Sequence, residues 1–180
     1  MKLSLKVSVI AMLTSLSILF RIAKNLFTVV QFVNFPLLFA MLGGALYGFH
    51  IGFLVGLFSF VVSDLVVGLG AWTFIDGLLA GVIGGSWAMI IKVMDRGGFF
   101  LTVAYLSVLL YDVSSSAGLY MLFGLRPLDA LVLGFLGLFL PAYGGYLFGV
   151  GVVTELTTSL LFLLIFRALE KRGVGLWMRK

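Results

Sequence analysis

The longest apolar run of the sequence, residues 35–70, constrains the fold more than any other feature. As one helix this run would be about 54 Å long at a rise of about 1.5 Å per residue. The hydrocarbon core of a bilayer is only about 30 Å thick, so the run must fold back on itself. We place the turn at residues 48–52, Gly-Phe-His-Ile-Gly. The run therefore predicts a short span and then a second span that ends near Gly68 or Gly70.

Apolar runs long enough to cross a bilayer recur through the rest of the chain. They predict four further spans, at about residues 5–20, 75–94, 99–123 and 145–169. The apolar segment 129–140 is only about a dozen residues long, which suits a re-entrant or interfacial helix better than a span. The predicted fold is therefore an all-α integral membrane protein of about six transmembrane helices, with this short segment before the last one. We expect residues 1–180 to form a single polytopic transmembrane domain.

Composition supports a lipid environment, because charged residues make up 11% of the chain and hydrophobic residues 62%. A soluble domain carries about 25% charged residues, and so few charges cannot cover a surface in water. The chain has no cysteine and one histidine, so we expect no disulfide, thiol nucleophile, metal centre or other cofactor. The first apolar stretch lacks a small-residue cleavage site, and we expect it to be retained as a helix.

Basic residues are unevenly divided between the two predicted sides of the membrane. With six spans, both termini and the 92–98 loop share one side, which holds nine basic residues against three on the other. Such an excess marks the cytoplasmic side, so both termini are predicted to be cytoplasmic, with the protein in the plasma membrane. We therefore read the net charge of +5 as a signal of topology and not of nucleic-acid binding. The nine residues are Lys2, Lys6, Lys92, Arg96, Arg167, Lys171, Arg172, Arg179 and Lys180.

Glycines recur at every fourth position in two places. Small residues let helix backbones approach closely in lipid, where no hydrophobic effect drives helices together. The series Gly44, Gly48, Gly52 and Gly56 crosses the predicted turn, so it cannot form one continuous face. A second series, at positions 77, 81 and 85, lies on one predicted helix and indicates a tight contact with a neighbouring helix.

Four carboxylates fall within or beside predicted spans, where a charge is costly and is a site hypothesis by default. These are Asp64, Asp76, Asp112 and Glu155. The predicted topology places Asp112 about 20 Å and Glu155 about 15 Å along their helices, near mid-membrane or slightly outward. We expect no lysine or arginine at a matching depth. Either some of the acids are protonated, or the ligand is cationic or rich in hydrogen-bond donors.

The polar residues of the outer side, Asn34 among them, converge with these acids on a predicted outward-facing pocket. Alternatives remain for several members: a helix cap for Asp64 and Asp76, and hydrogen bonds to nearby hydroxyls for Asp112 and Glu155. Trp72 also fits an interfacial anchor, and Tyr111, Tyr143 and Tyr146 fit either an aromatic belt or a stacking surface for a planar ring. The predicted substrate-binding residues are Asn34, Asp64, Trp72, Thr73, Asp76, Asp112, Ser115, Tyr143 and Glu155.

One stretch of the sequence resembles a known family. Residues 43–56, Gly-Gly-Ala-Leu-Tyr-Gly-Phe-His-Ile-Gly-Phe-Leu-Val-Gly, resemble the turn between the second and third helices of S components of energy-coupling factor transporters. The resemblance continues through Ser63-Asp64 and a glycine-rich segment at residues 80–85. Residues 70–73, Gly-Ala-Trp-Thr, are similar to a GPWTPWQ-like segment of such proteins, without its proline and glutamine.

The resemblance implies a function and partners. S components bind vitamins or related micronutrients and pass them to a transmembrane T subunit driven by two ATPases. Many carry an Ala-x-x-x-Ala motif on the first helix that docks the T subunit, and here Ala11 and Ser15 stand in the corresponding positions. The implied mechanism is capture of the ligand from outside, followed by reorientation of the whole subunit against the T subunit.

Other function classes fit the residues less well. The chain has no Walker-type nucleotide-binding motif, as expected of a subunit without its own ATPase. A self-sufficient proton- or cation-coupled carrier is the alternative, with Asp112 and Glu155 relaying the ion, but such carriers often show internal repeats and we find none. An intramembrane enzyme would have to rely on a pair of carboxylates, since the chain has no cysteine, one histidine and no Gly-x-Ser-x-Gly elbow. We therefore predict a protein that is not an enzyme.

Overall fold

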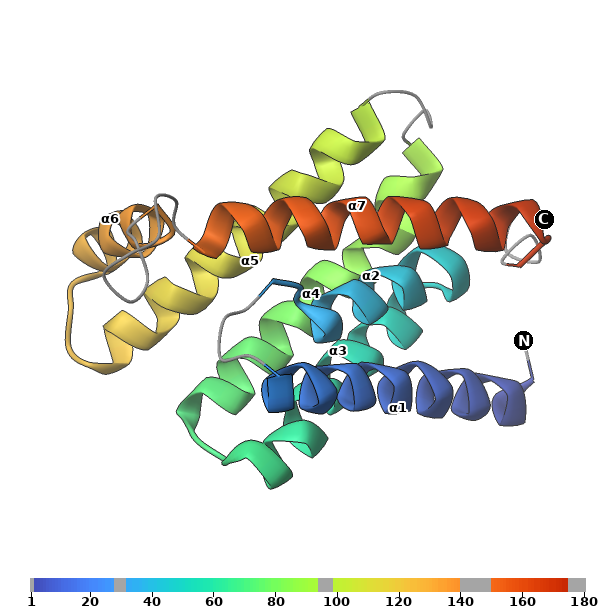
Figure 1. Ribbon diagram of the computed structural model, residues 1–180, viewed down its shortest axis with the longest axis horizontal. Helices are drawn as coiled ribbons and strands as arrows, with labels where there is room; N and C mark the ends of the chain where they lie inside the picture. The colour runs from blue at the N-terminus through green and yellow to red at the C-terminus, as the bar shows by residue number, and fades with distance from the viewer. Residues whose placement is uncertain (1, 28–31, 94–98, 140–149, 175–180) are drawn as a thin grey trace.

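The computed structural model describes residues 2–27, 32–93, 99–139 and 150–174, and the secondary structure of these ranges is all-helical (Figure 1). This confirms the predicted all-α fold class. The helices are α1 (Leu3–Phe27), α2 (Phe35–Tyr47), α3 (Phe49–Val67), α4 (Ala71–Val93), α5 (Phe99–Leu122), α6 (Pro127–Gly137) and α7 (Val150–Lys171).

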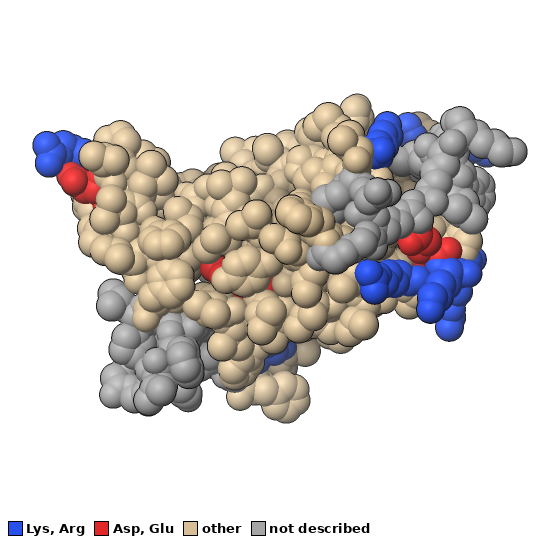
Figure 2. Space-filling model, turned by 90° about the horizontal axis from the view of Figure 1, so that it is seen from above, with Lys and Arg blue, Asp and Glu red and all other residues tan. Residues whose placement is uncertain are grey.

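Five of these helices, α1, α3, α4, α5 and α7, are long and apolar enough to cross a membrane. Their outer faces carry large exposed apolar side chains, such as Leu65 on α3, Met89 on α4 and Leu164 on α7. In the view of Figure 2, lysine and arginine gather mainly at the two ends of the molecule, and a broad, largely uncharged surface lies between them. A surface of this kind is suited to lipid and not to water. The chain is a multi-pass membrane protein.

Helix α2 differs from the long helices because it is short and almost fully enclosed. Its 13 residues would span about 20 Å, less than the hydrocarbon core of a bilayer. All but three of those residues are buried, since α1, α3, α4 and α7 pack around it. Asn34 caps the helix and Pro36 follows in its first turn, where a missing N–H costs nothing. Helix α2 is therefore the central helix of the bundle.

Two predicted chain reversals are confirmed at glycines. Gly48 alone separates α2 from α3 and has φ 103°, a left-handed conformation that favours glycine. His50 lies in the first turn of α3 and is exposed. Gly68, with φ 132°, ends α3 near the predicted position. The short apolar segment before the last helix is also helical, as α6, although it begins at Pro127 and residue 140 lies outside the described residues.

Two predicted boundaries were wrong, and both matter for the site. The first helix does not end before the basic residues Arg21 and Lys24 but continues through them to Phe27. Helix α4 begins at Ala71, so Trp72 and Thr73 are helical and not part of a loop. The Thr73 hydroxyl accepts a hydrogen bond from the Gly70 N–H at 3.2 Å, which supports this earlier start.

The predicted close contact along the second glycine series is confirmed between α3 and α4. A methyl group added at Gly77, Gly81 or Gly85 would lie 3.3, 2.8 or 3.0 Å from the carbonyl oxygens of Leu57, Phe53 and Phe49, respectively. Each glycine lies four residues further along α4, and the residue that it faces lies four residues earlier on α3. The two helices are therefore antiparallel. The two backbones approach closely over three successive turns, most tightly at Gly81, where an added methyl group would lie 2.8 Å from a main-chain oxygen.

The first glycine series divides between α2 and α3, as predicted, and both helices pack through these glycines against α4. An added methyl group at Gly44 would overlap the carbonyl oxygen of Gly84 on α4. One at Gly52 would lie 2.7 Å from the Gly44 Cα atom, and one at Gly56 would lie 2.6 Å from the Ala80 carbonyl carbon. Helices α2, α3 and α4 therefore form one closely packed unit.

The remaining helices pack around this unit. Trp87 on α4 is fully buried against Phe100 on α5 and Phe162 on α7, with ring centroids 5.3 and 4.6 Å away. In Figure 1 the start of α1, the α2–α3 turn and the end of α7 lie at one end of the molecule. The α3–α4 connection and α6 lie at the other end.

Substitution of Gly44 by alanine tests the glycine packing. The added methyl group has no space against Gly84, so we expect a loss of stability of about 1–3 kcal/mol. Gly137→Ala on α6 is the matched control, because its methyl group would meet only the Tyr120 hydroxyl at 3.9 Å. Thermal unfolding in mild detergent should show a lower midpoint for Gly44→Ala alone; equal midpoints would contradict the packing described.

Candidate ligand-binding pocket

A polar cavity of about 190 Å³ lies among five helices, α1 to α5. Its volume exceeds the roughly 150 Å³ of a cavity that admits benzene and is below the roughly 300 Å³ of small drug-sized pockets. It therefore has room for a molecule of about one substituted ring. The lining residues are Arg21, Lys24, Val33, Asn34, Pro36, Phe60, Asp76, Tyr111, Asp112 and Ser115.

Asn34 enters this cavity from the start of α2. Its side-chain oxygen accepts a hydrogen bond from the Leu37 backbone N–H at 3.1 Å. The backbone N–H of Asn34 donates to the Thr158 hydroxyl at 3.0 Å. The first bond orients the side chain and the second holds the backbone, and the residue is only 1% exposed. The amide nitrogen Nδ2 has no hydrogen bond of regular geometry among the described residues, and the Tyr111 side chain is its neighbour. Asn34 therefore lines the cavity beside Tyr111, with an amide that the protein itself engages only weakly.

Asp76 and Ser115 meet across the cavity from α4 and α5. The Ser115 hydroxyl donates a hydrogen bond to the Asp76 carboxylate. Asp76 lies in the second turn of α4, so this bond joins two helices and is not a cap of its own helix. Both predicted residues are therefore brought together in the pocket.

Asp112, one turn before Ser115 on α5, also lines the cavity. Its Oδ2 atom is buried and has no hydrogen-bond partner in the part of the chain that the structure describes. The charged groups that act on it are Glu155 and Asp76, both acids. A buried acceptor without a donor is costly, and this one is available to a ligand.

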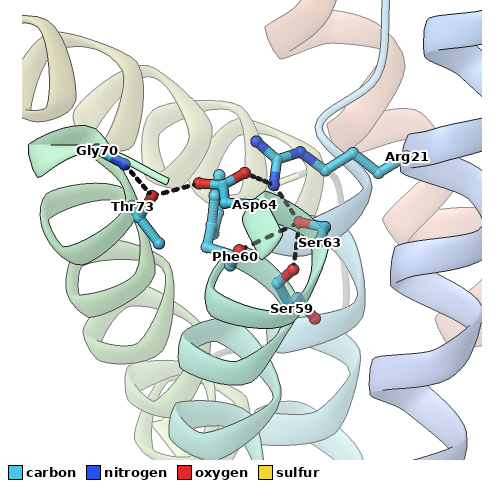
Figure 3. Close-up of polar contacts among 7 residues, drawn as sticks. All are labelled: Arg21, Ser59, Phe60, Ser63, Asp64, Gly70 and Thr73. Atoms are coloured by element: carbon cyan, nitrogen blue, oxygen red, sulfur yellow. Dashed lines mark hydrogen bonds and ion pairs between the residues drawn. The ribbon is translucent and has the colours of Figure 1, made fainter. Parts of the chain in front are cut away.

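Asp64 lies beside the cavity, and its carboxylate is bonded within the protein. It accepts hydrogen bonds from Arg21 on α1 at 2.6 Å and from the Thr73 hydroxyl on α4 at 2.7 Å (Figure 3). Arg21 also donates to the Ser63 hydroxyl. The carboxylate of α3 thus ties three helices together beside the cavity. Asp64 and Thr73, both buried, are not among the residues that line it.

This contact corrects the expectation that no basic residue lies at the depth of the acids. Arg21 forms an ion pair with Asp64, and its guanidinium lies 4.6 Å from the centre of the Phe60 ring. The error has a simple source: α1 was predicted to end at Phe20, which left Arg21 and Lys24 outside the bundle. If the first helix is taken to continue past Phe20, the spacing of three residues places Arg21 and Lys24 on the same face of it. This spacing is the sequence signal that could have predicted their position.

The other predicted residues lie away from the cavity or outside the described residues. Trp72 is 46% exposed and covers Gly70 on the surface, as an interfacial anchor would. Glu155 on α7 is fully buried; Tyr105 is its neighbour, yet neither carboxylate oxygen has a hydrogen bond of regular geometry within the described chain. Tyr143 falls in residues that are not described. Ala11 and Ser15 are exposed on α1, on the side opposite the buried Val9 and Leu13.

The cavity offers a ligand several polar groups and two aromatic rings. Among the described residues, no group of three or more His, Asp or Glu side chains could hold a metal ion. The cavity combines two basic residues, two acids, an amide and two hydroxyls with the aromatic rings of Phe60 and Tyr111, whose centroids lie 6.2 Å apart. Comparison of the chain with protein-family models, curated proteins and solved structures finds no match.

Removal of the Arg21 charge tests the three-helix tie. Arg21→Met leaves the Asp64 carboxylate, 1% exposed, without its cation, so we expect a loss of about 3 kcal/mol. Arg126→Met is the matched control, because its pair with Asp129 on α6 is largely exposed and should contribute less than about 1 kcal/mol. Thermal unfolding should also show that Arg21→Met with Asp64→Asn is less damaging than the two single losses added together; simple additivity would argue against the tie.

Proposed function

We propose that this chain is the substrate-binding subunit, or S component, of an energy-coupling factor importer for a vitamin or related micronutrient. The polar cavity among α1 to α5 is the observation that carries this proposal. It is of a size for one small molecule, and it holds an unpaired acceptor on Asp112 and the Asn34 amide, which has no hydrogen bond of regular geometry among the described residues. Such groups are expected in a site whose ligand completes the hydrogen bonding.

The arrangement of the helices supports a six-span topology with both termini in the cytoplasm. Helix α2 serves as the sixth, short span, because its polar backbone is enclosed by other helices and not exposed to lipid. The cavity draws on the last turns of α1, the start of α2 and the second turn of α4. In this topology those segments lie toward the outside of the plasma membrane, as capture of an external ligand requires.

The exposed face of α1 supports docking of a T subunit. Ala11 and Ser15 are exposed, and the large apolar residues Met12, Leu16 and Leu19 flank them. Small residues at this spacing allow a partner helix to approach closely in lipid. The T subunit and its pair of ATPases would then supply the movement that releases the ligand inside.

One observation favours a proton- or cation-coupled carrier as the second candidate. Glu155 is a buried acid whose charge acts on Asp112, and Glu155 has no regular hydrogen bond among the described residues. An acid in that setting can carry a proton. Reconstitution of the chain alone in liposomes separates the two candidates, since a binding subunit should not conduct protons without its partners.

Native mass spectrometry of the protein purified alone in mild detergent tests the binding function directly. We expect a vitamin-like compound at near one-to-one stoichiometry, and Asp112→Asn should reduce its occupancy because Asp112 lines the cavity. Asp129→Asn on α6 is the matched control, an acid outside the cavity. A protein without ligand that binds no member of a micronutrient panel, and that conducts protons, would refute the proposal.

A bulky residue on α1 tests the partner. Ala11→Phe should block uptake that depends on the T subunit and ATPases, because the ring would hold the partner helix away. Ligand binding by the isolated chain should not change. Val82→Phe, at an exposed position of α4, is the control and should leave uptake intact. Equal loss of uptake in both variants, or none in either, would contradict docking at Ala11.

A further inference from the structure

The charges that line the cavity come from helices on different sides of it. Arg21 and Lys24 belong to α1, whereas Asp76 and Asp112 belong to α4 and α5. Helix α1 packs on α2 and α3, while α5 packs on α4, α6 and α7. The cavity therefore has a basic wall and an acidic wall.

On the basic wall, Lys24 is the cation that a ligand can use. Arg21 is already held by Asp64 at 2.6 Å. Lys24 has no ion pair with any described residue, and the charged group that acts on it is the like charge of Arg21. Asn34 also lines the cavity, and its Nδ2 atom has no hydrogen bond of regular geometry among the described residues, although the Tyr111 side chain is its neighbour. This side of the cavity therefore presents a positive charge, together with an amide group that a ligand can also contact.

On the acidic wall, Asp112 is the counterpart of Lys24. The hydroxyl of Ser115 serves Asp76, whereas the Oδ2 atom of Asp112 has no partner among the described residues. The charged groups that act on Asp112 are acids. A ligand with only a positive charge would leave Lys24 uncompensated, and one with only a negative charge would leave Asp112 uncompensated. The uncompensated group would cost most at Asp112, whose Oδ2 atom is buried, and less at Lys24, which is partly exposed.

We propose that the cavity binds a small zwitterion, with its anionic group at Lys24 and the Asn34 amide and its ammonium group at Asp112. The aromatic rings of Phe60 and Tyr111 then accommodate the apolar part of the ligand. Charge-assisted hydrogen bonds at both ends set its orientation. This assignment of substrate class rests on the proposed function as a binding subunit.

Three compounds with the same ring and similar side chains test the assignment. Phenylalanine carries both charges, phenethylamine only the ammonium, and 3-phenylpropionate only the carboxylate. Thermal unfolding of the purified protein at millimolar concentrations of each gives their relative binding. We expect phenylalanine to bind at least about tenfold more tightly than either of the others, since each charged contact contributes about that factor.

Matched variants test whether the ligand's carboxylate binds at Lys24 and its ammonium group at Asp112. Lys24→Met should reduce phenylalanine binding to the level of phenethylamine, and Asp112→Asn should reduce it to the level of 3-phenylpropionate. The controls are Lys6→Met, an exposed lysine of the same helix, and Asp129→Asn; both should bind phenylalanine like the unaltered protein. Equal binding of phenethylamine and phenylalanine, or no binding of any of the three, would overturn the zwitterion assignment.

Failure of the zwitterion assignment can be distinguished from failure of the proposed function. A co-purifying ligand with a single charge, found by native mass spectrometry, would overturn the zwitterion assignment and leave the binding subunit in place. Absence of any ligand, together with proton conduction, would refute the function itself.

Discussion

Close contact between the backbones of α2, α3 and α4 is the constraint on which the other features depend. In lipid, helices gain little from burying apolar side chains against one another, so contact must come from packing at short range. Glycines at positions 44, 52, 56, 81 and 84 leave space for neighbouring main chain and for nothing larger. Helix α2, too short to cross a bilayer by itself, is enclosed by this unit and by the helices around it.

The polar cavity lies beside that closely packed unit. Glycine packing fixes α3 against α4, and so fixes Asp64 near Thr73 and the start of α4. Arg21 then joins α1 to the pair through Asp64. The ion pair thus holds the helix that also carries Lys24, and it consumes one cation and one acid that would otherwise face a ligand. The other polar residues that line the cavity are Lys24, Asn34, Asp76, Tyr111, Asp112 and Ser115.

Function in such a molecule depends on which buried polar groups are satisfied by the protein itself. Asp64 and Thr73 satisfy each other and Arg21, and so act as structural residues. The Asp112 Oδ2 atom has no partner among the described residues, and the Asn34 amide, beside Tyr111, has no hydrogen bond of regular geometry there; both residues line a cavity of ligand size. The same residue types therefore have two roles, and the difference is set by their neighbours and not by their chemistry.

The sequence by itself determined the solvent and the class of fold. Long apolar runs with few charges require lipid, and the Gly48 turn follows from a run too long for one crossing. Glycines every fourth residue predict that α4 packs tightly on a neighbouring helix, and the structure shows that this helix is α3. It also supplied Asn34, Asp76, Asp112 and Ser115 as pocket residues. Only the tertiary structure decided that Arg21 pairs with Asp64, that Lys24 reaches the cavity and that Trp72 does not. Pairing of side chains over 40 residues apart depends on how helices pack, and helix packing depends on contacts that residue spacing within one helix does not contain.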